Sequence, residues 1–396
     1  MNRKFFGIYI FIIMSLFIIL FIGCEADIPP SLFDPNADPG AAPVITAISP
    51  QDSTLAGIGE IVISGQNFSS QTGDNLVFFN KDRVEIISAS ATEIRLKSPN
   101  MPSDSIVIKI AKQGAIHFSN EQNYKLKRAV WQYGGFNYFD DVYGIACDKN
   151  ENLYVSSTTR IIEKVTPDEV RQDFGSTIFL IGSAMRITPD DYLYISRRSK
   201  PMYRIPLSSG GAAAKWTSAP GKIYDFDFSP SGICYAGGDN DDLYLIKPDG
   251  TGSAIAAYPD TYIKAVKVYD GYVYVGGGDK TAEHQYVWRH QIVSDSELGS
   301  QEVYFDWTDN IGEFSEVLSI VFDEFGDMYI GTDAEAGIII VHPDGSFEPL
   351  YPGVIEPTTY AMAWGPGQFL YVNRRSDIDS SKVGIIKINM LKNGAP

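Results

Sequence analysis

This 396-residue sequence is poor in the residues that cross-link small folds or bind metals. It contains three cysteines (Cys24, Cys147 and Cys234) and four histidines. Cys147 and Cys234 fall on different strands of different sequence repeats, so we expect no disulfide between them. Stability must therefore come from packing, for which 44% hydrophobic residues in a chain of this length is sufficient.

Basic residues are also scarce. The chain carries 32 Lys and Arg residues against 49 Asp and Glu residues, a formal net charge of −17 at pH 7. Such a surface repels the phosphate backbone of nucleic acids, so DNA and RNA are not expected as partners.

Only one long hydrophobic run is present, at residues 5–22. It follows the basic start Arg3 and Lys4 and ends at Gly23 and Cys24. This arrangement is typical of a secretion signal, which we predict over residues 1–23. The alternative is an uncleaved transmembrane anchor, for which the run is barely long enough.

The residues around Cys24 resemble a bacterial lipobox. The sequence LFIGC (20–24) ends in Gly-Cys, with the usual leucine one position early. The resemblance implies cleavage before Cys24 and acylation of its thiol, and hence a lipid-anchored protein of the bacterial envelope, with the outer membrane or cell surface favoured. Residues 24–42 are rich in Pro, Asp and Ala without periodicity, and we expect them to form a flexible tether.

Residues 43–126 predict an all-β sandwich. The segments EIVISG (60–65) and EIRLKS (93–98) alternate apolar and polar residues, and turn residues interrupt the strands about every ten positions. The stretch also resembles an IPT/TIG immunoglobulin-like module, on the following residues: Pro43, Ile45, Ile48, Ser49, Pro50, Gly57, Gly59, Ile63, Gly65, Asn67 and Phe68. The resemblance implies a spacer or a protein-contact unit.

The remaining residues, 127–396, contain a repeat marked by tyrosines. Each lies at the centre of a short apolar strand pattern: Tyr154, Tyr194, Tyr235, Tyr274, Tyr329 and Tyr371. Their separations of 40, 41, 39, 55 and 42 residues match the period of a four-stranded propeller blade. One blade cannot bury both of its faces. The predicted fold class is therefore all-β, an immunoglobulin-like sandwich plus a six-bladed β-propeller.

The last repeat lacks a fourth strand after GIIKINM (384–390). Residues 128–133 have the pattern of that strand, so we expect the two ends of the domain to share the last blade and close the ring. The repeats resemble NHL-type and gluconolactonase-like six-bladed propellers. That likeness is topological and carries no catalytic signature by itself.

Four charged residues are predicted on the innermost strands of blades 2, 3 and 4. They are Arg186, Asp225, Asp227 and Lys267, in an alternating set that is otherwise small or polar. Burying unpaired charges there would cost several kcal/mol, so they must pair, stay hydrated or meet a ligand. Two hypotheses remain open: mutual neutralisation in a water-filled channel, or a ligand site on the axis.

The loops after the tyrosine strands offer further candidates. Arg197 and Arg198 follow that strand in blade 2, and Arg374 and Arg375 follow it in blade 6, whereas Asp279 holds the comparable position in blade 4. Arginine pairs suit carboxylates and stack on flat rings. Pairing with local acidic residues is the alternative.

Aromatic residues occupy a loop that should be polar. The loop 134–139, which enters blade 1, contains Phe136 and Tyr138. Exposed rings there would form a stacking platform for sugars or a protein contact, whereas a buried hydrophobic plug is the alternative. Blade 4 holds the extra length of the 55-residue separation, including the loop 276–285 with His284.

The sequence predicts no catalytic residue, no metal site and no cofactor. No Glu lies on any inner strand, and His290 and His342 belong to outer strands, so no three-ligand cluster is expected on the axis. A Gly-x-Ser-x-Gly elbow, a paired-cysteine motif and a phosphate loop are all absent from the sequence.

A lipid anchor, an IPT/TIG spacer and a binding head together resemble surface glycan-binding proteins of Bacteroidetes-like bacteria. The resemblance implies non-catalytic capture of an extracellular glycan or oligosaccharide. An interaction with a protein partner in envelope assembly is the second hypothesis. A metal-dependent lactonase-type or lyase-type enzyme is the third.

Overall fold

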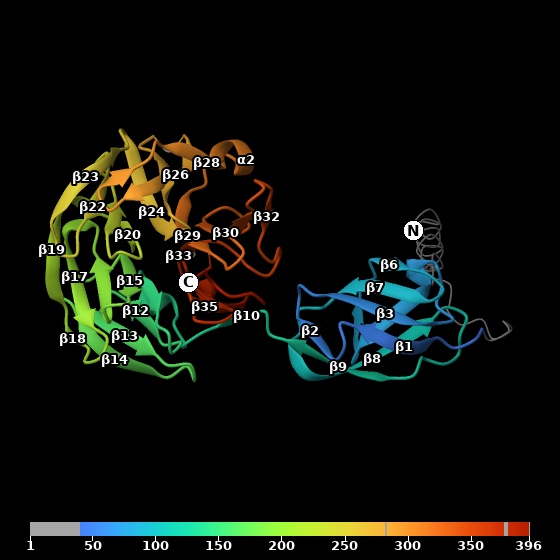
Figure 1. Ribbon diagram of the computed structural model, residues 1–396. Coiled ribbons are helices and arrows are strands. Elements are labelled where there is room, and N and C mark those ends of the chain that lie inside the picture. The colour runs from blue at the N-terminus through green and yellow to red at the C-terminus, as the bar shows by residue number, and fades with distance from the viewer. Residues whose placement is uncertain (1–39, 282, 376–378, 396) are drawn as a thin grey trace, which may run out of the picture. The chain divides into compact units, whose positions relative to one another are not determined.

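The computed structural model describes residues 40–281, 283–375 and 379–395 (Figure 1). The predicted signal segment 1–23, Cys24 and most of the predicted tether lie outside the described residues. The chain divides into two compact units, which we treat separately; the second contains residues 125–396 with the short stretches 53–60 and 97–105. Within the described ranges, no helix is long and apolar enough to cross a membrane.

The first part of the chain forms a β-sandwich of two sheets. One sheet has the order β1 (Val44–Ser49), β3 (Glu60–Gln66), β7 (Glu93–Lys97), β6 (Ser88–Ala89). The other has the order β2 (Ser53–Leu55), β9 (Gln122–Lys127), β8 (Ser103–Lys112), β4 (Asn75–Phe79), β5 (Asp82–Val84). Alternate residues of the longer strands, such as Ile61, Ile63 and Ile108, are fully buried between the sheets. The predicted sandwich is confirmed.

Six further sheets form the blades of the propeller in the described residues, which confirms the predicted fold class. We name the strands of each blade A to D from the axis outward. Blade 1 contains β11 (Ile145–Cys147), β12 (Leu153–Ser156), β13 (Ile161–Val165) and β14 (Arg171–Ser176). Blade 2 contains β15 (Ala184–Thr188), β16 (Tyr192–Ser196), β17 (Ser199–Pro206) and β19 (Ala214–Ile223). Blade 3 contains β20 (Asp225–Phe228), β21 (Cys234–Gly237), β22 (Asp242–Ile246) and β23 (Gly252–Ala257).

The remaining three blades follow the same plan. Blade 4 contains β24 (Thr261–Tyr269), β25 (Tyr272–Asp279), β26 (Gln285–Ser294) and β28 (Glu302–Asp306), followed by the helix α2 (Trp307–Ile311). Blade 5 contains β29 (Val317–Phe322), β30 (Met328–Thr332), β31 (Ile338–Val341) and β32 (Phe347–Pro349). Blade 6 contains β33 (Thr359–Trp364), β34 (Phe369–Arg374), β35 (Gly384–Asn389) and, from the start of the domain, β10 (Val130–Gln132).

Strand β10 pairs antiparallel with β35, so the first and last strands of the propeller share one blade. Val130 lies opposite Ile388, and Gln132 lies opposite Ile386. This pairing joins segments some 250 residues apart and leaves no open edge between blade 6 and the start of the ring.

The repeat tyrosines are core residues of the second strand in each blade. All six are at most 5% exposed. Their hydroxyl groups still need acceptors, and in three blades an aspartate of the hairpin between strands A and B provides one. Tyr154 donates to Asp148 at 3.2 Å, Tyr194 to Asp190 at 2.8 Å, and Tyr329 to Asp323 at 3.1 Å. The tyrosine therefore fills the core and also ties the hairpin to the blade.

The apolar set on strand A packs between the blades, as its alternation predicts. Its members are at most 5% exposed at these positions: Ile145, Met185, Phe226, Val266, Ile320 and Met362. The alternate set on strand A, which carries the four predicted charges, consequently faces the axis.

Candidate binding site

A cavity of about 560 Å³ lies at the centre of the propeller. Residues of all six blades line it. They come from the start of strand A and from the connection between strands B and C, which is the face on which the sequence places its candidates. The volume falls within the range of small-molecule sites in proteins.

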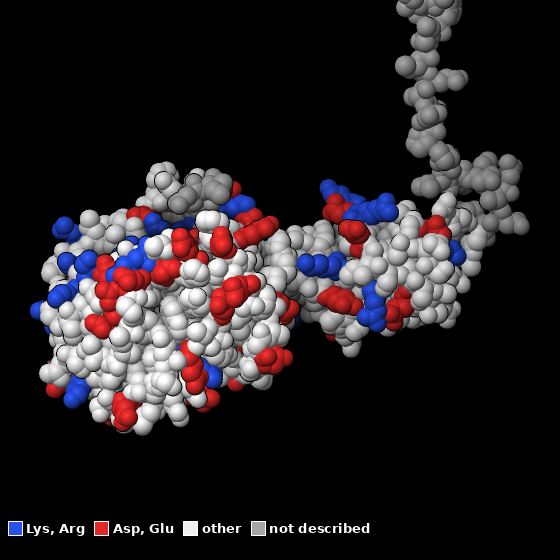
Figure 2. All heavy atoms as spheres, turned by 90° about the horizontal axis from the view of Figure 1, so that it is seen from above, with Lys and Arg blue, Asp and Glu red and all other residues white. Residues whose placement is uncertain are grey.

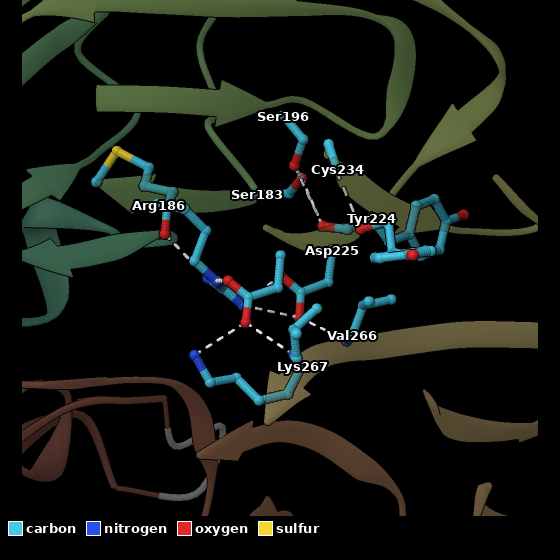
Figure 3. Close-up of polar contacts among 12 residues, drawn as sticks. Ser183, Arg186, Ser196, Tyr224, Asp225, Cys234, Val266 and Lys267 are labelled. Carbon is cyan, nitrogen blue, oxygen red and sulfur yellow. Dashed lines mark hydrogen bonds and ion pairs between the residues drawn. The ribbon is translucent and has the colours of Figure 1, made fainter. Parts of the chain in front are cut away.

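The four predicted inner-strand charges lie together and form one network (Figure 3). Arg186 on β15 reaches the carboxylates from one side, and Nη2 lies 2.8 Å from Oδ1 and 3.0 Å from Oδ2 of Asp225. Lys267 on β24 approaches from the other side, with Nζ 2.9 Å from Oδ2 of Asp227. Arg186 also reaches Asp227, with Nε 3.5 Å from Oδ1. Two cations thus face two anions.

Backbone donors complete the network. The amide of Val266 donates to Asp225 at 2.9 Å, and the amide of Val268 donates to Asp227 at 2.9 Å. Burial raises the pKa of Asp225 even though Arg186 opposes the shift. Burial acts on Asp227 in the same direction, but Lys267 and Arg186 outweigh it and hold the pKa of that carboxyl below its usual value.

This geometry matches the mutual-neutralisation hypothesis for the inner charges. Arg186 and Asp225 line the cavity, whereas Asp227 and Lys267 do not belong to its lining. The network therefore joins three blades through three ion pairs, and only the Arg186–Asp225 pair has both members in the cavity lining.

The arginines of the two loops have different environments. Arg198 lines the cavity, and its guanidinium carbon lies 5.4 Å from the ring centre of Tyr224 and 5.8 Å from that of Tyr360. Arg375 also lines it, 4.2 Å from the ring centre of Tyr143 and 5.6 Å from that of Tyr360. Rings and guanidinium groups thus alternate in a row of cation–π contacts across four blades. The order is Tyr224, Arg198, Tyr360, Arg375, Tyr143.

The other member of each arginine pair is turned away from the cavity lining. Arg197 donates to Ser199 at 2.8 Å and lies 5.3 Å from the ring centre of Phe179. Arg374 is 9% exposed, and its Nη1 lies 3.8 Å from Oε2 of Glu356. Burial lowers the pKa of Arg374. Neither residue lines the cavity, so any ligand contact of these two arginines would lie outside it.

Blades 4 and 5 contribute three carboxylates to the cavity lining, together with the two lysines Lys264 and Lys280. Asp279 lines it and accepts from His284 Nδ1 at 3.0 Å, while His284 itself is half-exposed beyond the lining. Asp333 and Glu316 lie on the same side, and the backbone amide of Glu316 donates to Asp333 at 2.7 Å. Much of the predicted loop 276–285 is strand, because β25 continues to Asp279 and β26 begins at Gln285.

The aromatic loop that enters blade 1 is only partly exposed. Phe136 is 3% exposed, and the guanidinium of Arg171 covers its ring at 3.9 Å. Phe136 thus corresponds to the buried hydrophobic plug, one of the two alternatives for this loop, and its ring is not available for stacking on a ligand. Tyr138 is 56% exposed and Phe139 is 92% exposed, with their ring centres 5.8 Å apart. Neither of these rings lines the cavity.

Sequence reasoning missed the aromatic lining of the cavity. Tyr224, Tyr262 and Tyr360 line it from blades 3, 4 and 6. A usable signal was present in the strand A alignment, at the position just before the inner set: Tyr143, Ser183, Tyr224, Lys264, Leu318 and Tyr360. All of these except Tyr143 line the cavity.

Charges of both signs are interspersed on the propeller. Figure 2 shows red and blue side chains side by side along the upper margin of the propeller, without a large patch of a single sign. In the residues that the structure describes, no group of three or more His, Cys, Asp or Glu side chains could hold a metal ion.

Residues 43–126 match the family described as IPT/TIG domain. This match confirms the resemblance of that part of the sequence to an IPT/TIG module. A search of curated proteins gave no match to the chain.

The chain is similar in structure to several solved proteins. An auxiliary nutrient binding protein of Bacteroides thetaiotaomicron matches with a TM-score of 0.54 at 15% identity, over 90% of this chain and 98% of that protein. A phosphatase candidate of the same species matches with a TM-score of 0.60 at 12% identity, over 90% of this chain and 99% of the other. A calcium-binding protein, regucalcin, of Agrobacterium tumefaciens matches with a TM-score of 0.50 at 16% identity, over 64% and 90% of the two chains. At these identities the similarity shows a shared fold.

Proposed function

We propose that this chain is a lipid-anchored protein of the bacterial envelope whose propeller captures a glycan or oligosaccharide in the axial cavity without catalysis. The observation that carries the proposal is the lining of the cavity. Three tyrosine rings, Tyr224, Tyr262 and Tyr360, share it with arginine, lysine and carboxylate groups. Aromatic faces that stack on a sugar ring and polar groups that bind its hydroxyls are what recognition of a sugar requires.

The dimensions of the cavity limit what it can hold. At about 560 Å³ it suits a small ligand, and it cannot enclose a long polymer. A glycan would therefore enter with one end or as a short oligosaccharide.

The cellular setting of the proposal depends on two other features. Cys24, which lies outside the described residues, would carry the lipid anchor. The IPT/TIG domain would act as a spacer between the anchor and the propeller. The shared fold with a protein described as an auxiliary nutrient binding protein from Bacteroides is compatible with this role.

Calorimetric titration of the full chain in detergent tests the proposal. The panel contains neutral and acidic oligosaccharides of three to six units, each incubated with the protein and analysed afterwards for cleavage. We expect saturable binding of at least one glycan class with the oligosaccharide unchanged. Replacing Tyr262, a ring of the cavity wall, with alanine should weaken that binding about tenfold, since the variant loses an aromatic face on which the sugar can pack.

A matched control is Phe325→Ala. Phe325 is 70% exposed on the hairpin between strands A and B of blade 5, and it does not line the cavity. This variant should bind as the unaltered chain does. Binding of no member of the panel would refute glycan capture, and cleavage of the oligosaccharide would refute a non-catalytic role.

A further inference from the structure

We infer that the ligand carries a carboxylate group and that Arg198 is the residue that binds it; this inference rests on the proposed function and adds the chemical class of the glycan. Arg198 lies in the connection between strands B and C of blade 2, directly before strand C, and lines the cavity. Three features of Arg198 support this inference: its charge balance, its position between two rings and the groups opposite it.

Arg198 differs from the other cations of the cavity in having no carboxylate partner. Arg186 pairs with Asp225, Lys264 with Glu316, Lys280 with Asp241, and Arg375 with Asp141. No acidic side chain pairs with Arg198 within the described part of the chain, although the protein carries a net charge of −17. Its positive charge is therefore available to an anion that enters the cavity.

The guanidinium of Arg198 lies between two rings, although the residue itself is exposed. Tyr224 and Tyr360 hold it at 5.4 Å and 5.8 Å from their ring centres, and Arg198 also donates to the hydroxyl of Tyr360. Burial raises the pKa of Tyr360, so its hydroxyl stays neutral and does not serve as the counter-ion. A guanidinium held in this way loses little freedom when it binds a carboxylate with two parallel hydrogen bonds.

The backbone of Arg198 is strained. Its φ angle is 54°, in the left-handed region that favours glycine or asparagine. A long side chain at such an angle costs about 1 kcal/mol or more. Arginine therefore occupies a site where the turn alone would favour a different residue.

The opposite wall offers acceptors. Asp333 lines the cavity from blade 5 and, in the described ranges, pairs with no cation. Ser319 also lines it, is 9% exposed, and its hydroxyl has no hydrogen-bond partner among the described residues. A ligand with a carboxylate at one end and hydroxyl groups at the other would bind Arg198 with the first and Asp333 and Ser319 with the second. A uronic acid or a related acidic sugar has that chemistry.

Paired probes test the inference. Oligomers of galacturonic, glucuronic and mannuronic acid are each compared with the fully methyl-esterified form, which keeps the sugar ring and removes the charge. We expect at least one acid to bind about tenfold to hundredfold more tightly than its ester. Arg198→Gly should abolish that preference. Because glycine suits a φ of 54°, this variant should unfold no more readily than the unaltered chain.

Arg204→Ala is the matched control. Arg204 is also stacked on a tyrosine, 4.3 Å from the ring centre of Tyr192, but it does not line the cavity. Its removal changes the net charge equally and should leave the preference for acids intact. Esters that bind as tightly as acids, or an acid preference that survives Arg198→Gly, would overturn the inference while leaving glycan capture standing. Failure of every acid and every ester to bind would also overturn the inference, and glycan capture would then depend on the neutral oligosaccharides of the first panel.

Discussion

Nη2 of Arg186 lies 2.8 Å from Oδ1 of Asp225, which joins the innermost strands of blades 2 and 3 by an ion pair in the wall of the axial cavity. Asp227 and Lys267 extend this pair toward blade 4. The four inner-strand charges, for which the sequence left both mutual neutralisation and a ligand site open, are thus largely paired with one another. They link the innermost strands of three blades.

The first prediction concerns the loss of one charge from this network. Arg186→Met should lower the free energy of unfolding by about 3 kcal/mol, because it leaves Asp225 buried without a cation. Thermal unfolding of the propeller, followed by circular dichroism, measures the effect. Arg186→Met combined with Asp225→Asn should recover part of the loss, since the uncompensated charge is then removed. If Arg186→Met is as stable as the unaltered chain, the ion pair between Arg186 and Asp225 does not contribute to the free energy of unfolding.

The second prediction concerns the C-terminal end of the propeller. Nζ of Lys392 lies 2.8 Å from Oδ2 of Asp323, which is fully buried, and 2.8 Å from Oδ2 of Asp327. Lys392→Met should therefore cost about 2 kcal/mol of stability, reduced from the value of a fully buried pair because the lysine is partly exposed. Lys149→Met is the control, since Lys149 is exposed and forms no ion pair within the described ranges. Equal melting temperatures for the two variants would mean that the ion pairs of Lys392 with Asp323 and Asp327 do not stabilise the propeller.

The third prediction is a pH dependence at His342. The hydrogen bond to Asp327 raises the pKa of His342 above its ordinary value, with Glu348 and Asp344 adding to the shift. A raised pKa means that the protonated ring stabilises the fold below the pKa of the unfolded chain, and that this contribution is lost as the pH rises through the folded value.

The measurement compares the unaltered chain with His342→Gln. The difference in melting temperature should be larger near pH 6 than near pH 8, because the unfolded histidine titrates at about 6.5. A difference that is the same at both pH values would mean that folding does not shift the histidine.

The fourth prediction concerns the cysteines. Burial raises the pKa of the thiols of Cys147 and Cys234, and both are free. Neither should react with a thiol reagent near pH 8 in the native protein, because the thiolate is the reactive form.

In denaturant the reagent also counts the thiols of the mature chain. If Cys24 is acylated through its sulfur, two of the three cysteines react; if it is free, all three do. Two reacting thiols, with a matching mass increase at the N-terminus, are the expected result. Three would contradict the lipid anchor.

The fold could be predicted from the sequence because its main signal is periodic. Tyr154 and its five counterparts recur at the spacing of a blade, and each proves to be a buried residue of strand B. The alternation along strand A likewise distinguishes the apolar residues that pack between blades, such as Phe226, from the residues that face the axis, such as Asp225. Periodicity of this kind follows from backbone geometry and is visible in a single sequence.

The site could be predicted only in part, because cavity lining depends on which loops converge. Arg198 and Arg375 were identified by their type, but their neighbours Arg197 and Arg374 have the same type and point elsewhere. Phe136 looked like a loop aromatic and is covered by Arg171. The rings of Tyr224 and Tyr360 come from different blades, and no local pattern relates them to the arginine that they enclose.

A crystal structure of the full chain with the oligosaccharide that binds most tightly would test the central claim most directly. The account predicts density for a sugar in the axial cavity, stacked on Tyr224, Tyr262 or Tyr360, with an acidic group at Arg198 and the glycosidic bonds intact. Density for the glycan on the IPT/TIG domain or on the outer strands of the propeller, with an empty axial cavity, would contradict it.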